Sequence, residues 1–198
     1  MKLILASASP RRAEILRNAD LKFEAWPANV DETRLPGESA ADYVLRLALA
    51  KARLAARHAS ERSAPAIYIG ADTTVVLDHH VLAKPASFEE ARWMLRQLSA
   101  RTHEVLTALA LVSAPDGREI SGVESTKVTF TALSEAEIED YLASGEPFDK
   151  AGAYAIQGLG GRYVTRIEGC YFNVMGLPLS RLWSMLQSFR SDEKPNVH

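Results

Sequence analysis

Cysteine is almost missing from this chain of 198 residues, and long apolar runs are missing altogether. The single thiol, Cys170, has no partner for an internal disulfide, which fits a reducing compartment, so we expect a cytoplasmic protein. No apolar run approaches the length that spans a bilayer, and the run at residues 3–6 is too short for a signal peptide. The net charge of -2 argues against a generally basic nucleic-acid binder. We therefore expect neither a nucleic acid nor a membrane as partner.

Several common catalytic and binding motifs are also absent. The sequence contains no G-x-x-x-x-G-K-[ST], which excludes a P-loop, and the histidines show no H-E-x-x-H spacing. The glycines within residues 158–161 do not open a helix after a strand, so they are not a dinucleotide fingerprint. Cys170 has no evident partner for thiol catalysis. The carboxylates and cations of the chain remain as the candidate chemistry.

The chain has the composition of an ordinary globular protein, with 47% hydrophobic and 24% charged residues. It shows no internal repeat and no long linker, which predicts a single domain over residues 1–190 and a disordered tail over residues 191–198. Long antiparallel hairpins mixed with helices predict an α/β fold with a strongly twisted mixed sheet. Beyond the N-terminal strand and helix, helices are predicted at residues 39–58, 87–98, 134–142 and 179–189, and strands at residues 67–77, 81–83, 104–112, 119–131, 163–167 and 171–174.

Four of these elements carry finer predictions. Capping boxes are expected at the starts of two helices, where Ser87 is followed by Glu90 and Ser134 by Glu137. The strands at residues 163–167 and 171–174 are expected to pair as a hairpin.

The N-terminal segment combines an apolar strand, a polar loop and the start of a helix. Ser9 suits the N-cap position, and Pro10 suits the first helical position, where a missing N–H costs nothing. The free N–H groups of that helix start, beside Arg11 and Arg12, form a site suited to phosphate. The same residues equally fit a capped helix whose arginines are simply solvated.

Asp72 stands out because it lies inside a predicted strand rich in β-branched residues. An ionised carboxylate there is costly unless it is paired, hydrogen-bonded or bound to a metal ion. Gly70, two residues earlier, leaves space for another group to approach the backbone. The alternative is an aspartate at the end of the strand that turns to solvent.

Other acids, cations and glycines can complete a site around Asp72. Asp31 and Glu32 form an acidic pair in a loop, and Mg²⁺ takes few carboxylates while keeping waters for phosphate oxygens. The return strand of the Asp72 hairpin brings Lys84 back towards it, and Lys51 lies at the edge of a helical stripe. Lys150 precedes a glycine-rich segment. Together these groups form the inventory of a metal–polyphosphate site.

The motifs in their order resemble the Maf family of nucleoside triphosphate pyrophosphatases over roughly residues 3–189. The segments that carry the resemblance are S-A-S-P-R-R at 7–12, D-E at 31–32, G-A-D-T at 70–73, K-P at 84–85, D-K-A-G-A-Y-A-I-Q-G at 149–158 and G-L-P-L at 176–179. The resemblance implies a twisted mixed sheet in two lobes with a central cleft, similar to inosine triphosphate pyrophosphatases. It also implies cleavage between the α and β phosphates, a requirement for Mg²⁺ or a similar divalent cation such as Mn²⁺, and a homodimer as one assembly found in the family.

Three positions place the chain nearest the branch of the family that acts on dTTP and UTP. The resemblance makes Arg11, Thr73 and Gln157 the specificity positions, because the branch acting on 7-methyl-GTP carries other residues there. Modified pyrimidine nucleotides fit the same branch. Two alternatives stay open: a 7-methyl-GTP pyrophosphatase, and a non-catalytic nucleotide-binding regulator of septum formation.

The resemblance also implies a role for each site residue. Asp72 accepts the proton of the attacking water, and Glu32 and Asp72 hold the divalent cation. Lys84 belongs with these two in the catalytic group. The substrate-binding residues, which hold the triphosphate, are Ser9, Arg12, Lys51 and Lys150.

Overall fold

A single mixed sheet of seven strands organises the protein in a computed structural model that describes residues 2–59 and 65–191. The strand order is β2-β1-β3-β5-β6-β7, and β4 also pairs with β3. β1 is parallel to β2 and β3, whereas all other pairs are antiparallel. The predicted mixed sheet is therefore confirmed. The strands are β1 Lys2–Leu5, β2 Glu24–Ala25, β3 Ala66–Leu77, β4 His80–Leu82, β5 Thr102–Ala114, β6 Glu119–Phe130 and β7 Val164–Glu168.

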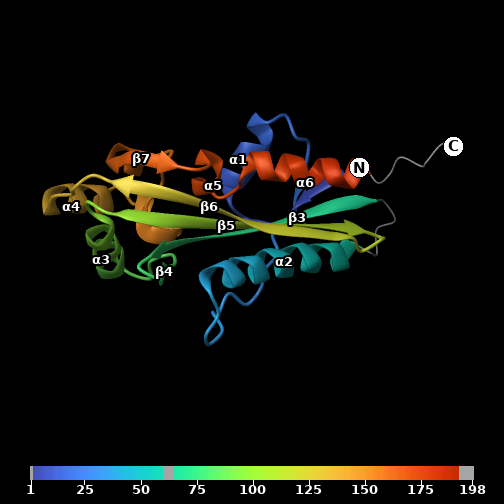
Figure 1. Cartoon of the computed structure of the whole chain (residues 1–198), viewed down its shortest axis with the longest axis horizontal. Coiled ribbons are helices and arrows are strands. Elements are labelled where there is room, and N and C mark those ends of the chain that lie inside the picture. Colours follow the sequence, from blue (N-terminus) through green and yellow to red (C-terminus); the bar gives the residue numbers. More distant parts are fainter. Residues whose placement is uncertain (1, 60–64, 192–198) are drawn as a thin grey trace.

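Helices cover both faces of this sheet (Figure 1). α2 packs on one face, and α1 and α6 pack on the other, while α3 and α4 lie at one end. The α-helices are α1 Pro10–Asn18, α2 Ala40–Ala59, α3 Phe88–Leu98, α4 Glu135–Ala143, α5 Tyr171–Val174 and α6 Leu179–Ser191. Three short 3-10 helices lie between α4 and β7: η1 Glu146–Asp149, η2 Ala151–Ala153 and η3 Leu159–Tyr163.

The alternation of side chains along β3 decides which residues meet which helix. Ile67, Ile69 and Ala71 lie in the apolar cluster shared with α1 and α6. Tyr68 lies in the cluster shared with α2, on the opposite face. In the first half of the strand the even-numbered residues therefore face α2, and the odd-numbered residues face α1 and α6.

Two lobes follow from the distribution of the core. The first half of β3 takes part in the two clusters with α1, α2 and α6. A third cluster, around Val75, Leu77 and the helices α3 and α4, fills the other end of the sheet. β3 runs through both lobes, so its middle lies between them.

Two details differ from the sequence-based expectations. Residues 171–174 are not a strand paired with β7: they form the short helix α5, whose buried Asn173 donates to Val105 O at 2.9 Å. Tertiary hydrogen bonding thus overrides the strand propensity of this segment. Ser87 caps α3 as expected, but the carboxylate of Glu90 accepts from Ala86 N–H at 2.7 Å and does not close the box.

Other expectations concern the second capping box, the tail and the membrane. The capping box of α4 forms in full between Ser134 and Glu137. The predicted tail lies outside the described residues except for Ser191, which ends α6. None of the helices in the described parts of the chain is long and apolar enough to span a membrane.

Candidate active site

A break in strand pairing lies at the middle of β3, between the two lobes. β1 pairs with residues 66–69, and β4 pairs with residues 75–77 on the same edge, because β5 occupies the other edge. Neither β1 nor β4 pairs with residues 70–74. Asp72 and Thr73 lie in this interval and point to opposite faces of the sheet. The break gives other parts of the chain access to the backbone of β3 here.

Gly70 brings α2 into direct contact with β3. A Cβ atom at this position would lie 2.0 Å from Ala48 O and 2.8 Å from Ala52 N. The space left by this glycine is thus filled by the helix backbone rather than by a ligand. The close approach lets Lys51, between these two helical residues, reach Asp72 on the same face of the strand.

Lys51 joins two carboxylates from distant segments. Its Nζ donates to Asp72 Oδ1 at 2.7 Å and lies 2.7 Å from Glu32 Oε1. Asp72 and Lys51 are both 8% exposed, so each charge is compensated by the other in a largely dehydrated position. The predicted aspartate is therefore buried and paired, and the alternative in which it turns to solvent is wrong.

Glu32 is held over α2 by its neighbours in the loop. Tyr43 Oη donates to Glu32 O at 3.0 Å. Arg46 makes two bonds to Glu38, at 2.6 and 2.9 Å, and donates to Thr33 O at 3.0 Å. These contacts fix the acidic loop to the helix that carries Lys51.

The electrostatic surroundings of Glu32 are strongly positive. Burial raises the pKa of its carboxyl, but the hydrogen bond and charge of Lys51, together with the charges of Lys84 and Arg12, lower the pKa further. The net shift is downward, so Glu32 is an anion at neutral pH. The structure thus brings these three cations within electrostatic reach of one carboxylate.

Arg12 closes the break in the sheet. Its Nε donates to Gly176 O at 2.8 Å, and its Nη1 donates to Ser7 Oγ at 3.0 Å and to Ala71 O at 2.9 Å. Its Nη2 donates to Thr73 Oγ1 at 3.0 Å. The guanidinium therefore supplies a donor to the unpaired edge of β3, at Ala71 O, and links α1 to the segment before α6, at Gly176 O.

The charge of Arg12 persists despite its burial. Burial lowers its pKa, and the charge of Asp72 opposes that shift. A guanidinium has five N–H donors, of which the protein uses four, and it stays protonated. One N–H of Nη2, beside Thr73, makes no hydrogen bond within the described residues.

A second group of charges crosses from α1 to the other lobe. Arg11 Nη1 lies 3.3 Å from Asp149 Oδ2. Lys150 Nζ donates to Glu146 O at 2.6 Å and also bonds the Asp149 carboxylate. Arg11 and Lys150 therefore share one anionic partner.

The remaining predicted residues take different positions. Ser9 caps α1 by accepting from Arg12 N–H at 3.5 Å, as predicted. Lys84 is exposed just after β4, where the preceding carbonyl of Ala83 accepts from Gly152 N–H at 3.2 Å. Gln157 is also exposed, and no hydrogen bond joins its side chain to another residue in the part of the chain that the structure describes.

The glycine-rich segment after η2 packs on Glu146 of η1 and on Tyr141 of α4. Glu146 accepts from Leu159 N–H and Gly160 N–H, both at 3.0 Å, and from Tyr141 Oη–H at 2.7 Å. A Cβ atom on Gly158 would lie 2.1 Å from the same carboxylate. These glycines therefore allow the loop backbone to lie close to the carboxylate of Glu146, which accepts its N–H groups.

Three further residues of the site were given no role from the sequence. Ser7 and Thr107 are buried hydroxyls that bond Arg12 and Thr73, respectively. Tyr43 lies on α2, and its bond to the Glu32 backbone depends on the folded loop. Ser7 belongs to the S-A-S-P-R-R segment, whereas no local pattern distinguishes Thr107 or Tyr43 from ordinary core residues.

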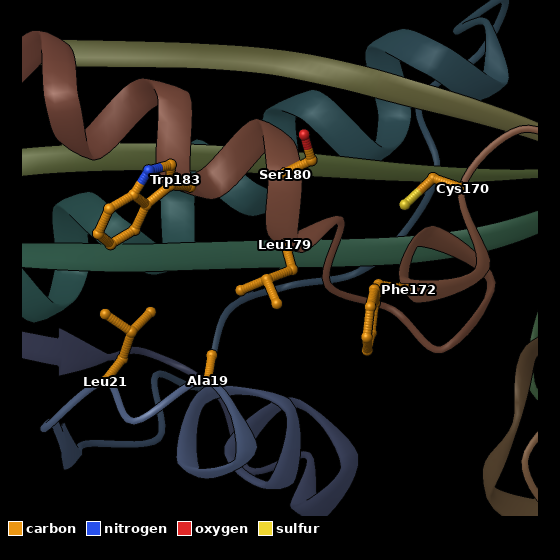
Figure 2. A pocket seen from close by; sticks show the side chains of 7 residues that line it. All are labelled: Ala19, Leu21, Cys170, Phe172, Leu179, Ser180 and Trp183. Atoms are coloured by element: carbon orange, nitrogen blue, oxygen red, sulfur yellow. The ribbon is translucent and has the colours of Figure 1, made fainter.

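An apolar pocket of about 350 Å³ lies elsewhere, between the end of α1 and α6 (Figure 2). Leu21, Phe172, Leu179 and Trp183 face into it, beside the single cysteine. None of the residues that line it is charged, so it lacks the groups that a polyphosphate requires. The predicted site residues lie outside its lining.

The carboxylates near Lys51 fit a divalent cation that keeps part of its water. Glu32 and Asp72 bond the same ammonium, so one cation can contact both. The described residues contain no cluster of three or more histidine, cysteine, aspartate or glutamate side chains of the kind that encloses a metal ion. Two carboxylates with open positions for phosphate oxygens are typical of Mg²⁺ rather than of a structural metal.

Comparisons with known proteins identify the family of the chain. The family described as Maf-like protein matches residues 2–189, and the chain belongs to the Maf family. It is 50% identical to the dTTP/UTP pyrophosphatase of Koribacter versatilis strain Ellin345, over 94% of each chain. It is 49% identical to the dTTP/UTP pyrophosphatase of Vibrio vulnificus strain YJ016, over 95% of this chain and 98% of that one. The corresponding protein of Clostridioides difficile strain 630 is 45% identical, over 96% of each chain.

Solved structures support the fold. The structure of a HAM1 protein from Coxiella burnetii superposes with a TM-score of 0.50 at 16% identity, covering 95% of this chain and 99% of that one. Because the superposition covers nearly the whole of both chains, the two proteins share the α/β fold.

Proposed function

We propose that this protein hydrolyses dTTP and UTP, and modified pyrimidine relatives of them, to the nucleoside monophosphate and pyrophosphate. The observation that carries the proposal is the convergence of Asp72 and Glu32 on Lys51, beside Arg12, in a chain about half identical to dTTP/UTP pyrophosphatases. The substrate is taken up without a nucleic acid or membrane partner, in the cytoplasm. A homodimer is the proposed assembly.

The site residues divide the work of attack at the α-phosphorus. Asp72 orients a water molecule and takes its proton as the new oxygen–phosphorus bond forms. The bond between the α-phosphorus and the bridging oxygen breaks, and pyrophosphate leaves with that electron pair. Lys84 and Lys150 stabilise the charge that develops on the leaving group. Ser9 and the start of α1 donate hydrogen bonds to the phosphates.

Lys51 and Arg12 are the proposed contacts of the triphosphate beside the carboxylates of Glu32 and Asp72. Glu32 and Asp72 would hold a Mg²⁺ or Mn²⁺ ion, which would neutralise charge at the phosphate oxygens. When the triphosphate binds, Lys51 exchanges its two carboxylates for phosphate oxygens, and Arg12 offers its remaining N–H. Arg11, Thr73 and Gln157 are the proposed residues of base selection.

The experiment uses the purified chain with dTTP, UTP and 7-methyl-GTP in the presence of Mg²⁺ or Mn²⁺. We expect turnover of the two pyrimidine nucleotides, with dTMP or UMP and pyrophosphate as first products. Orthophosphate as the first product contradicts the proposed reaction. Nucleotide binding without turnover would instead identify a regulator, and preference for 7-methyl-GTP would identify the other branch.

A further inference from the structure

A hydrogen-bonded chain of two hydroxyl groups and one carbonyl group begins at Thr73 and runs into the core of the protein. Thr73 Oγ1 and Thr107 Oγ1 are 2.9 Å apart, across the β3–β5 pair. Thr107 Oγ1 is in turn 2.9 Å from Asn173 O, in α5. Thr107 is fully buried, so no water competes for these bonds.

The direction of every proton in this chain is fixed by chemistry. A carbonyl oxygen only accepts, so Thr107 must give its single hydroxyl proton to Asn173 O. Thr107 then has no proton for Thr73, and two oxygens at 2.9 Å need one between them. The hydroxyl of Thr73 therefore donates to Thr107.

Towards the substrate, the hydroxyl of Thr73 can only accept a hydrogen bond. Its oxygen has two lone pairs, and Arg12 Nη2 donates to one of them at 3.0 Å. The proton is committed to Thr107, so only an accepting lone pair remains. Thr73 is partly exposed, and this lone pair is the one that its hydroxyl has left for a substrate.

We infer that Thr107 is a positioning residue for base selection: it holds the Thr73 hydroxyl as an acceptor for the N3–H group of a uracil or thymine ring. This inference rests on the proposed function and deepens it. The N3 atom of cytosine carries no hydrogen and repels an accepting oxygen. The wild-type protein is thus expected to favour UTP over CTP.

Thr107→Val tests the inference by removing the acceptor of the Thr73 proton at nearly constant shape. The freed hydroxyl can then donate to cytosine N3, so the ratio of kcat/KM for UTP to that for CTP should fall about tenfold, the effect of about one hydrogen bond. The change should lie mainly in a lower KM for CTP with kcat nearly unchanged, because the base contact is the same in ground and transition states. Thr107→Ser, which keeps the hydroxyl, should restore the wild-type ratio.

A matched control lies in the same strand. Thr102 Oγ1 pairs with Thr129 Oγ1 at 2.8 Å in an exposed position, so Thr102→Val removes a similar hydroxyl pair. This variant should leave the UTP to CTP ratio unchanged.

Should Thr107→Val fail to fold, the wild-type protein is assayed with 3-methyl-UTP, which lacks the N3 hydrogen. Its kcat/KM is then expected about tenfold or more below that of UTP.

The outcomes separate the two proposals. No turnover of UTP by the wild-type protein overturns the proposed function and this inference together. Turnover of UTP with an unchanged UTP to CTP ratio in Thr107→Val overturns the inference alone. Equal handling of UTP and CTP by the wild-type protein, or of UTP and 3-methyl-UTP, also overturns it.

Discussion

Lys51 Nζ and Asp72 Oδ1 lie 2.7 Å apart, although their residues come from a helix and from the strand that follows it. The pair forms where α2 touches β3 without an intervening side chain, at Gly70. Glu32 completes the cluster from a loop before the helix. Three segments thus create one charged centre at the break in the sheet.

Asp72→Asn should remove turnover while keeping the fold. The amide has the shape of the carboxylate but cannot accept the proton of the attacking water, so kcat should fall by about 10² to 10⁴. Pyrophosphate release and circular dichroism measure the two properties. Asp78→Asn, in an exposed pair with Arg101 on the turn of the same hairpin, is the matched control and should keep kcat.

Glu32→Gln should weaken the response to the divalent cation. Loss of one carboxylate should raise the half-saturating Mg²⁺ or Mn²⁺ concentration about tenfold or more. Even residues that only hydrogen-bond to metal ligands change metal affinity by about 10- to 100-fold when they are mutated. The shift of Tm caused by the cation gives a second measurement that is independent of turnover. Asp31→Asn, at an exposed acid that accepts from Thr33 N–H, should behave like the wild type. Equal cation dependence in both variants contradicts the assignment.

Gly70→Ala should separate α2 from β3. The added methyl group would lie 2.0 Å from Ala48 O, a backbone atom that cannot turn away. We expect a loss of about 1–3 kcal/mol in the free energy of unfolding, and lower kcat because Lys51 is displaced. Gly122→Ala is the control: its methyl group meets only the flexible end of Arg181, at 2.8 Å. Urea unfolding compares the two variants.

Arg12→Lys should damage both stability and activity. A lysine keeps the charge but cannot supply donors to Gly176 O, Ala71 O and Thr73 together. Buried acceptors without donors cost about 1–3 kcal/mol, which urea unfolding measures. Arg17→Lys, on the exposed part of the same helix, should change neither property.

The sequence predicted the local features of this site well, because they depend on neighbouring residues. The cap at Ser9 and the capping box at Ser134 follow from side chains within three residues of each other. Asp72, Glu32 and Lys51 were candidates from their residue types and positions, the resemblance to the Maf family implied their roles, and the fold brings both carboxylates into contact with Lys51. Their chemical roles stay predictions.

The rest depends on contacts between distant segments. Gly70 marked a close approach, but only the packing shows that the approaching group is a helix. The strand expected at residues 171–174 is a helix because Asn173 bonds two neighbouring strands, through Val105 and Thr126. Nor does any sequence pattern reveal the hydroxyl of Thr107 behind Thr73.

His103 should make the fold sensitive to acid. Burial lowers the pKa of its imidazole to about 4, so the folded protein binds this proton less readily than the unfolded chain does. Its contribution is therefore intact above pH 6.5 and is lost as pH falls towards 4, by about 3 kcal/mol in all. Urea unfolding across this range should show a weaker pH dependence in His103→Gln than in the wild type. His80→Gln, at an exposed histidine, should retain the wild-type dependence.

Hydrolysis of dTTP in water enriched in oxygen-18 tests the central claim most directly, because it reports which phosphorus the water attacks. Attack at the α-phosphorus, as proposed for the site around Asp72, places the label in dTMP and leaves the pyrophosphate unlabelled. Label found in the pyrophosphate would place the attack at the β-phosphorus and contradict the account.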